Sequence, residues 1–224
     1  MAVTKPSQAW GTAACSEPRW PASLAIVCAA LLNYMLPGKF TLGPPWAVPL
    51  IEMAILIPLS IAAPRRTPHE RKPVQIAAVG LIVVANAANV ASLIFLIRHL
   101  LFDSKTVTGI ELLYSSVAIW LTNIIVFALW YWELDRGGPD ERMLADHRAP
   151  DFLFPQMVTP DCTNADWTPG FIDYIYVSFT NATAFSPTDT MPLTPWAKSL
   201  MLIESVASLA TIAIVASRAI NILS

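Results

Sequence analysis

A short polar segment before the last long apolar run carries the side chains that are best suited to chemistry. Hydroxyl groups stand at Thr183, Ser186, Thr188 and Thr190, and a carboxylate stands at Asp189. Oxygen atoms of these kinds can replace the water around a cation, and rings of them in an oligomer line ion pathways. These residue types therefore predict that a partly hydrated cation binds along this segment.

The composition places this segment in an integral membrane protein. Of the 224 residues, 55% are hydrophobic and only 13% are charged, whereas soluble domains carry about 25% charged residues. The net charge of −2 gives no reason to expect nucleic-acid binding, which needs a clustered basic face. We therefore expect a multi-pass protein of the cell membrane whose partner is the lipid bilayer, and no nucleic-acid partner.

The apolar runs predict an all-α fold with about five transmembrane helices, at residues 20–36, 46–63, 74–97, 109–132 and about 194–223. Residues 171–183 predict a helix of about 13 residues, near 20 Å long, which is too short to cross the hydrocarbon. We expect a re-entrant pore helix and loop here, before the last helix. Tryptophan and tyrosine at 130–132 indicate that the fourth helix ends at a membrane interface.

Polar residues inside these helices are candidates for support of the pore segment. Asp173 lies in the first turn of the short helix, where a carboxylate suits the helix dipole. Glu204 lies inside the last helix and should face protein or water, either as a structural bond behind the pore loop or with a role in conduction. Asn86 and Asn89 share one helical face and predict interhelical hydrogen bonds.

A long loop at residues 140–170 is rich in proline and acidic residues. The acidic side chains allow two interpretations, a solvated surface or a vestibule whose field concentrates cations; they are Asp140, Glu141, Asp146, Asp151, Asp161 and Asp166. Phe152, Phe154 and Trp167 indicate that the loop folds back onto the molecule.

The segment from Ser178 to Lys198 resembles the pore signature of the potassium-channel superfamily. The matching residues keep their spacing without a gap; they are Ser178-Phe179, Thr183, Asp189, Pro192, Thr194 and Ala197-Lys198. The resemblance implies a homotetramer that passes a monovalent cation along its axis at 183–189. It divides the chain into three N-terminal transmembrane helices at 1–108 and a pore-domain-like unit at 109–224. That unit contains an outer helix, the long loop, a pore helix, a filter-like loop and an inner helix.

The filter itself departs from the family pattern. Where the family has T-V-G-Y-G, this chain has Ala184-Phe185-Ser186-Pro187-Thr188. The family's filter aims backbone carbonyls at the ion, which needs left-handed residues that glycine adopts easily. Both glycine positions carry side chains here, and Pro187 fixes its own backbone near φ of about −65°. We therefore expect a cation channel that is not strictly potassium selective.

Other interpretations keep the fold and change the function. A non-conducting relative could serve as a membrane scaffold or partner subunit, since the filter glycines are replaced. A membrane enzyme or carrier is a third class. Cys15, Cys28 and Cys162 form no C-x-x-C pair, and no nucleophile–base or phosphate-loop motif is present. We expect no metal site, no cofactor, no catalytic residue and no enzyme activity.

The orientation in the membrane stays open at this point. The resemblance puts the pore loop outside and the C-terminus inside. The flanking segments on the pore-loop side carry nine basic residues against four on the other side, and the positive-inside rule then puts the pore loop inside.

Overall fold

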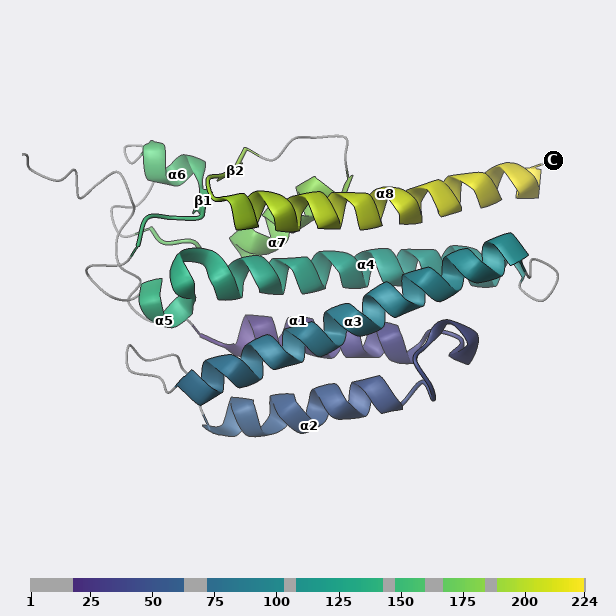
Figure 1. The fold of residues 1–224 in the computed structure, drawn as a ribbon, viewed down its shortest axis with the longest axis horizontal. Coiled ribbons are helices and arrows are strands. Elements are labelled where there is room, and N and C mark those ends of the chain that lie inside the picture. The colour runs from purple at the N-terminus through teal and green to yellow at the C-terminus, as the bar shows by residue number, and fades with distance from the viewer. Residues whose placement is uncertain are drawn as a thin grey trace, which may run out of the picture.

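Five helices run side by side along the long axis of the molecule (Figure 1). The computed structural model of the chain describes residues 18–62, 72–102, 108–142, 148–159, 167–183 and 189–223. The five helices are α1 (Trp20–Tyr34), α2 (Ala47–Ala62), α3 (Lys72–Phe102), α4 (Gly109–Leu134) and α8 (Pro195–Leu223). Helix α4 packs against α1, α3, α7 (Phe171–Thr183) and α8, and α1 and α3 lie between it and α2 (Figure 1). The core is therefore organised around α4.

Three of the described helices are long and apolar enough to cross a membrane, and they are α3, α4 and α8. The prediction of a mostly helical membrane protein is confirmed at this level. Helices α1 and α2 are apolar but have only 15 and 16 residues, about 23 Å each at 1.5 Å per residue. The hydrocarbon core is about 30 Å thick, so the count of five crossings stays a prediction.

Short elements join the long helices at the end where α4 finishes (Figure 1). They are η2 (Asp135–Gly137), α5 (Pro139–Arg142), β1 (Phe152–Leu153), α6 (Pro155–Val158) and β2 (Met191–Pro192). β1 and β2 pair antiparallel, with Phe152 opposite Pro192. At the other end, η1 (Gly38–Phe40) connects α1 and α2.

The prediction that the 140–170 loop folds back is confirmed by its aromatic side chains. Phe152 is fully buried, and its ring centroid lies 5.9 Å from that of Trp196. Phe154 is also buried and stacks edge-on against Trp167 at 5.9 Å. These rings form an aromatic layer over the end of α4, where such contacts contribute about 0.5–1.5 kcal/mol each beyond area burial.

One sequence interpretation of this region is wrong. Asp151 was counted with a solvated or vestibule-lining acid cluster, yet only 9% of it is exposed, because its carboxylate is taken up by internal hydrogen bonds. Tyr131 and Trp132 are almost fully buried among α1, α7 and α8, which pack against α4, and the expectation that the fourth helix ends at a membrane interface stays a prediction.

Candidate functional site

Helix α7 enters the bundle and the chain then returns to the end from which it came. Near the start of α7, the ring of Phe171 lies 5.8 Å from that of Trp132 at the C-terminal end of α4. Near the end of α7, the amide of Asn181 donates to the backbone oxygen of Met201 on α8 over 2.9 Å. The chain then reappears beside β1, where the Leu193 amide donates to the Asp151 carbonyl over 2.8 Å. The short helix therefore points into the bundle with its C-terminus.

Glu204 ties the end of α7 to α4 and α8. The side chain is fully buried. Its Oε2 accepts a hydrogen bond from Tyr131 over 2.5 Å and one from Asn181 over 2.6 Å. Its Oε1 lies within hydrogen-bond distance of the Ser178 hydroxyl. One carboxyl group thus holds two residues of α7 and one of α4, which confirms the expectation that Glu204 faces protein.

The Ser178 hydroxyl constrains the proton arrangement around Glu204. Its Oγ lies 2.8 Å from the backbone oxygen of Ile124 and also contacts Glu204 Oε1. A serine hydroxyl has one hydrogen, and a carbonyl oxygen only accepts. A proton on Glu204 satisfies both contacts, with Glu204 donating to Ser178 and Ser178 donating to Ile124. A neutral acid also avoids the cost of a charge within the membrane.

A second polar contact chain links α3, α4 and α8 deeper in the bundle. The Asn89 amide donates to Asn123 Oδ1 over 3.4 Å, and Asn123 donates to Ser208 Oγ over 3.0 Å. The predicted interhelical bonding is therefore confirmed for Asn89. For Asn86, the side-chain oxygen is buried and has no hydrogen-bond partner among the described residues.

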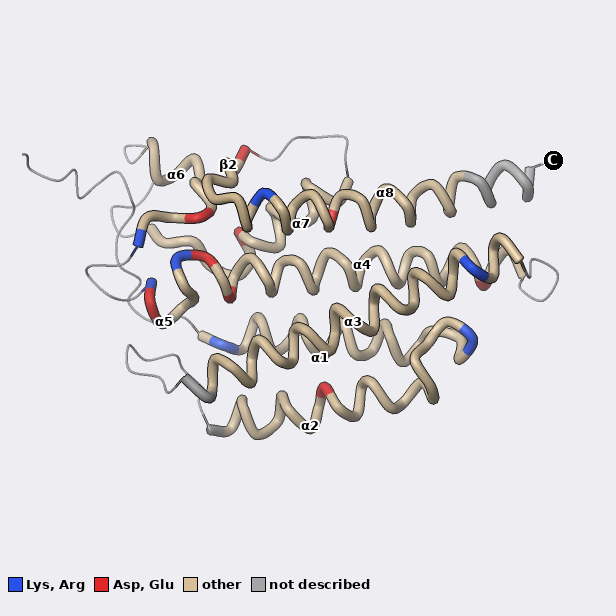
Figure 2. Tube along the Cα trace, viewed as in Figure 1, with Lys and Arg blue, Asp and Glu red and all other residues tan. Residues whose placement is uncertain are grey.

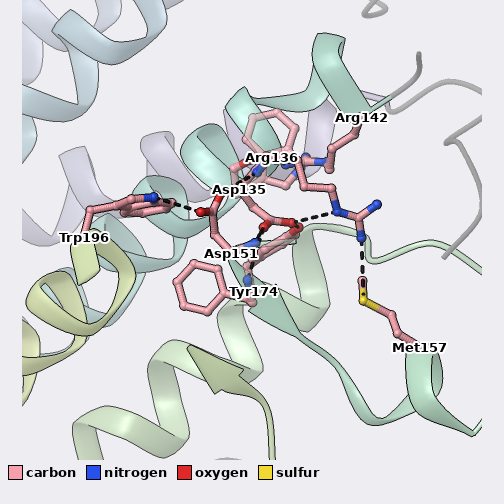
Figure 3. A network of polar contacts seen from close by, with 9 residues as sticks. Asp135, Arg136, Arg142, Asp151, Met157, Tyr174 and Trp196 are labelled. Carbon is pink, nitrogen blue, oxygen red and sulfur yellow. Dashed lines mark hydrogen bonds and ion pairs between the residues drawn. The ribbon is translucent and has the colours of Figure 1, made fainter. Parts of the chain in front are cut away.

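Two buried aspartates fasten the loop elements to the end of α4 (Figure 3). Asp135 Oδ1 accepts from the backbone amides of Asp151 and Phe152 at 2.8 and 3.3 Å, and its Oδ2 accepts from the Tyr174 hydroxyl at 2.7 Å. Asp151 accepts from the Arg136 amide at 2.8 Å and from the Trp196 indole at 2.9 Å. This junction connects α4, β1, α7 and α8.

Two buried arginines balance the aspartates. Arg136 Nε lies 3.6 Å from Asp135 Oδ2. Arg142 donates to the backbone oxygens of Trp132 and Asp135 at 2.7 and 3.1 Å, and it lies over the Tyr174 ring at 5.4 Å. Buried charges are tolerated when they are paired and hydrogen-bonded. We call Asp135, Arg136, Arg142 and Asp151 the junction cluster.

Asp173 stands at the N-terminal end of α7, as expected. Its Oδ2 accepts a hydrogen bond from the Gly170 amide over 2.8 Å. Burial raises the pKa of the Asp173 carboxyl above its ordinary value, while the bond from Gly170 acts in the opposite direction. The carboxylate therefore caps the first turn of α7 and does not contact Glu204 at the far end.

The predicted ion-path residues are only partly described by the structure. Thr183 is the last residue of α7, and its hydroxyl donates to the Thr180 carbonyl over 3.0 Å. Asp189 is exposed, just before β2. The five residues between them lie outside the described residues, and they are Ala184, Phe185, Ser186, Pro187 and Thr188.

Sequence reasoning missed the junction cluster. The run Glu133-Leu134-Asp135-Arg136-Gly137-Gly138 was understood only as the end of a helix. Arg136, Gly137 and Gly138 all have positive φ, at 57°, 91° and 109°. The sequence did contain a signal for the cluster, namely an acidic–basic pair followed by two glycines directly after a membrane helix. Charged side chains so close to the hydrocarbon need partners within the protein.

Comparison with protein-family models, with curated proteins and with solved structures finds no match to this chain. Across the described residues, no group of three histidine, cysteine, aspartate or glutamate side chains could hold a metal ion. Function is therefore argued from the geometry and from the pore-loop resemblance.

Proposed function

We propose that this protein is a pore-loop cation-channel-like membrane protein related to potassium channels. In this proposal α4 is the outer helix, α7 the pore helix and α8 the inner helix of each subunit. Four copies surround an axis in the cell membrane, and a monovalent cation passes along residues 183–189. No enzymatic step is part of the proposal.

The course of the chain around α7 is the observation that carries the proposal. A 13-residue helix is held at its start by Asp135 through Tyr174 and near its end by Glu204 through Asn181. The chain then returns to the β1–β2 pair at the starting end. A pore loop needs this path, because the ion-binding segment must follow a helix that stops partway through the membrane.

The chemistry at the end of α7 suits a cation. The C-terminus of a helix carries about half a negative charge, and it is aimed at the segment that begins with Thr183. Asp189 adds an exposed carboxylate on the far side of that segment. Hydroxyl and carboxylate rings of this kind bind partly hydrated cations, so we propose weak selectivity among monovalent cations.

The second candidate is a non-conducting relative that serves as a scaffold or partner subunit. Ser186 and Thr188 favour it, because they occupy the two positions where the family has glycine. Phe185 could also block an axis by dewetting. Replacing residues 186–188 by Gly-Tyr-Gly is expected to create conductance in this candidate, where the unaltered protein shows none.

The oligomer viewed along the membrane normal tests the shared architecture. The proposal predicts four copies with residues 183–189 facing one axis. A monomer, or an oligomer in which these segments face lipid, would rule out the channel. Ion current then separates the channel from the scaffold.

A further inference from the structure

A cavity opens at the end of the bundle opposite the junction cluster. It has a volume of about 530 Å³ and is lined by Lys39, Phe95, Arg98, His99 and Phe102. We call it the α3-end cavity, since four of its five residues belong to the last turns of α3. It lies in the N-terminal helices and shares no residue with the proposed ion path.

The polar side of the cavity carries basic groups. Arg98 is exposed and makes no hydrogen bond or ion pair within the described part of the chain. Lys39 Nζ lies 3.0 Å from Glu111 Oε2, so that part of its charge is balanced by one carboxylate. Figure 2 shows basic segments at the end of α3 and in the turn after α1, with few charges between the two ends of the bundle. Among the described residues at this cavity, two cations, Lys39 and Arg98, therefore face one carboxylate, Glu111.

The remaining walls of the cavity are aromatic, and the His99 imidazole is held in place by its neighbours. His99 Nδ1 donates to the Phe95 carbonyl over 2.9 Å, and the imidazole meets the Phe40 ring edge-on at 5.4 Å. Phe102 is 83% exposed, and its neighbour Leu101 is 67% exposed. A cationic group beside exposed apolar side chains, at the end of a membrane-length helix, is typical of the region where lipid headgroups meet the hydrocarbon.

We propose that the α3-end cavity binds the phosphate headgroup of an anionic phospholipid. Arg98 and Lys39 contact the phosphate, and the first part of an acyl chain lies along Phe95 and Phe102. Basic pockets between membrane helices bind lipid headgroups in this way, and each cation near the surface strengthens binding about fivefold. Zwitterionic lipid has the same phosphate but no net charge, so the site should prefer the anionic lipid.

Lipid titration of the purified full-length protein in detergent tests the proposal. Bound phosphatidylglycerol and phosphatidylcholine are counted separately by native mass spectrometry. We expect phosphatidylglycerol to bind more tightly, and Arg98→Gln to weaken it about fivefold while phosphatidylcholine is unchanged. Arg98→Lys should retain most of the preference. Arg98 is exposed, and thermal unfolding will verify that each variant is folded.

Lys198→Gln is the matched control, because Lys198 is an exposed cation in the first turn of α8, at the other end of the bundle. The proposal is wrong if the two lipids bind equally, or if Lys198→Gln and Arg98→Gln weaken phosphatidylglycerol binding equally. Titration with soluble glycerol phosphate distinguishes a lipid headgroup from a free phosphate ester. If it binds as tightly as the lipid and its binding depends on Arg98, the ligand is a free phosphate ester and the lipid assignment fails.

Discussion

The hydroxyl of Tyr131 on α4 donates a 2.5 Å hydrogen bond to Glu204 Oε2 on α8, and both side chains are fully buried. This contact joins the outer and inner helices of the proposed pore unit at the level where α7 ends. Polar contacts between membrane helices hold a bundle in register and contribute about 0.6–2 kcal/mol each.

Tyr131→Phe removes that hydroxyl and keeps the buried ring. We expect the free energy of unfolding to fall by about 1–2 kcal/mol, because Glu204 loses one hydrogen-bond donor. Denaturant titration in a fixed detergent measures the change. Tyr114→Phe on the same helix is the control: Tyr114 is 45% exposed, and within the described part of the chain its hydroxyl bonds only to the Met35 sulfur, so its loss should be below about 0.5 kcal/mol. Equal losses in the two variants would contradict the assigned contact.

Glu204→Gln should be tolerated if Glu204 is a neutral acid. A glutamine amide can donate to Ser178 while its oxygen accepts from Tyr131 and Asn181, so we expect a loss below about 1 kcal/mol. Glu204→Leu leaves Tyr131 and Asn181 without their acceptor and Ser178 without its donor, and it should cost more than about 2 kcal/mol. Infrared spectroscopy should also show a protonated carboxyl band that disappears in Glu204→Gln. A glutamine variant as unstable as the leucine variant would indicate a carboxylate instead.

Asp135→Asn tests the junction cluster. The substitution removes a buried negative charge beside Arg136 and Arg142, and uncompensated buried charges cost about 3–5 kcal/mol. We expect loss of thermal stability and faster proteolysis within residues 139–170. Glu141→Gln makes the same chemical change at an exposed position of neighbouring α5, and it should leave both readouts unchanged. A mild effect of Asp135→Asn would show that the cluster is not held by charge balance.

Gly138→Ala should destabilise the turn after α4. Gly138 has φ of 109°, and an added Cβ would lie 2.9 Å from the Glu133 carbonyl oxygen. Strained backbone of this kind costs about 1–3 kcal/mol. Gly80→Ala should have the opposite effect on stability. Gly80 lies inside α3, and no neighbouring atom lies within 4 Å of an added Cβ. Alanine there should stabilise the helix by about 0.5–1 kcal/mol, and the same sign for both variants would refute the conformational argument.

Local patterns predicted the elements well. The bounds of α7 at 171–183 follow from a short amphipathic run between Gly170 and a polar segment, and the structure has the same bounds. The expectation that Glu204 faces protein follows from the cost of a carboxyl group in lipid. Its partners were not predictable, because Tyr131, Ser178 and Asn181 come from two other helices.

The junction cluster depends on contacts that no local pattern encodes. Asp135 bonds to the amide of Asp151 across a loop, and that pairing exists only when the aromatic layer folds over α4. The burial of Tyr131 also depends on contacts between distant parts of the chain. Aromatic residues near a helix end fit a membrane interface or a protein core equally well, and the sequence alone does not show that α7 and α8 pack against α4.

Ion current across a planar bilayer tests the central claim most directly. Purified protein in a salt gradient should give a current whose reversal potential shifts toward the equilibrium potential of the cation. Asp189→Asn should reduce the cation preference, because the exposed carboxylate of the proposed ion path is lost. Thermal unfolding of the variant verifies that the fold is intact. No current from a folded oligomer, or a current that favours anions and ignores Asp189→Asn, would contradict the account.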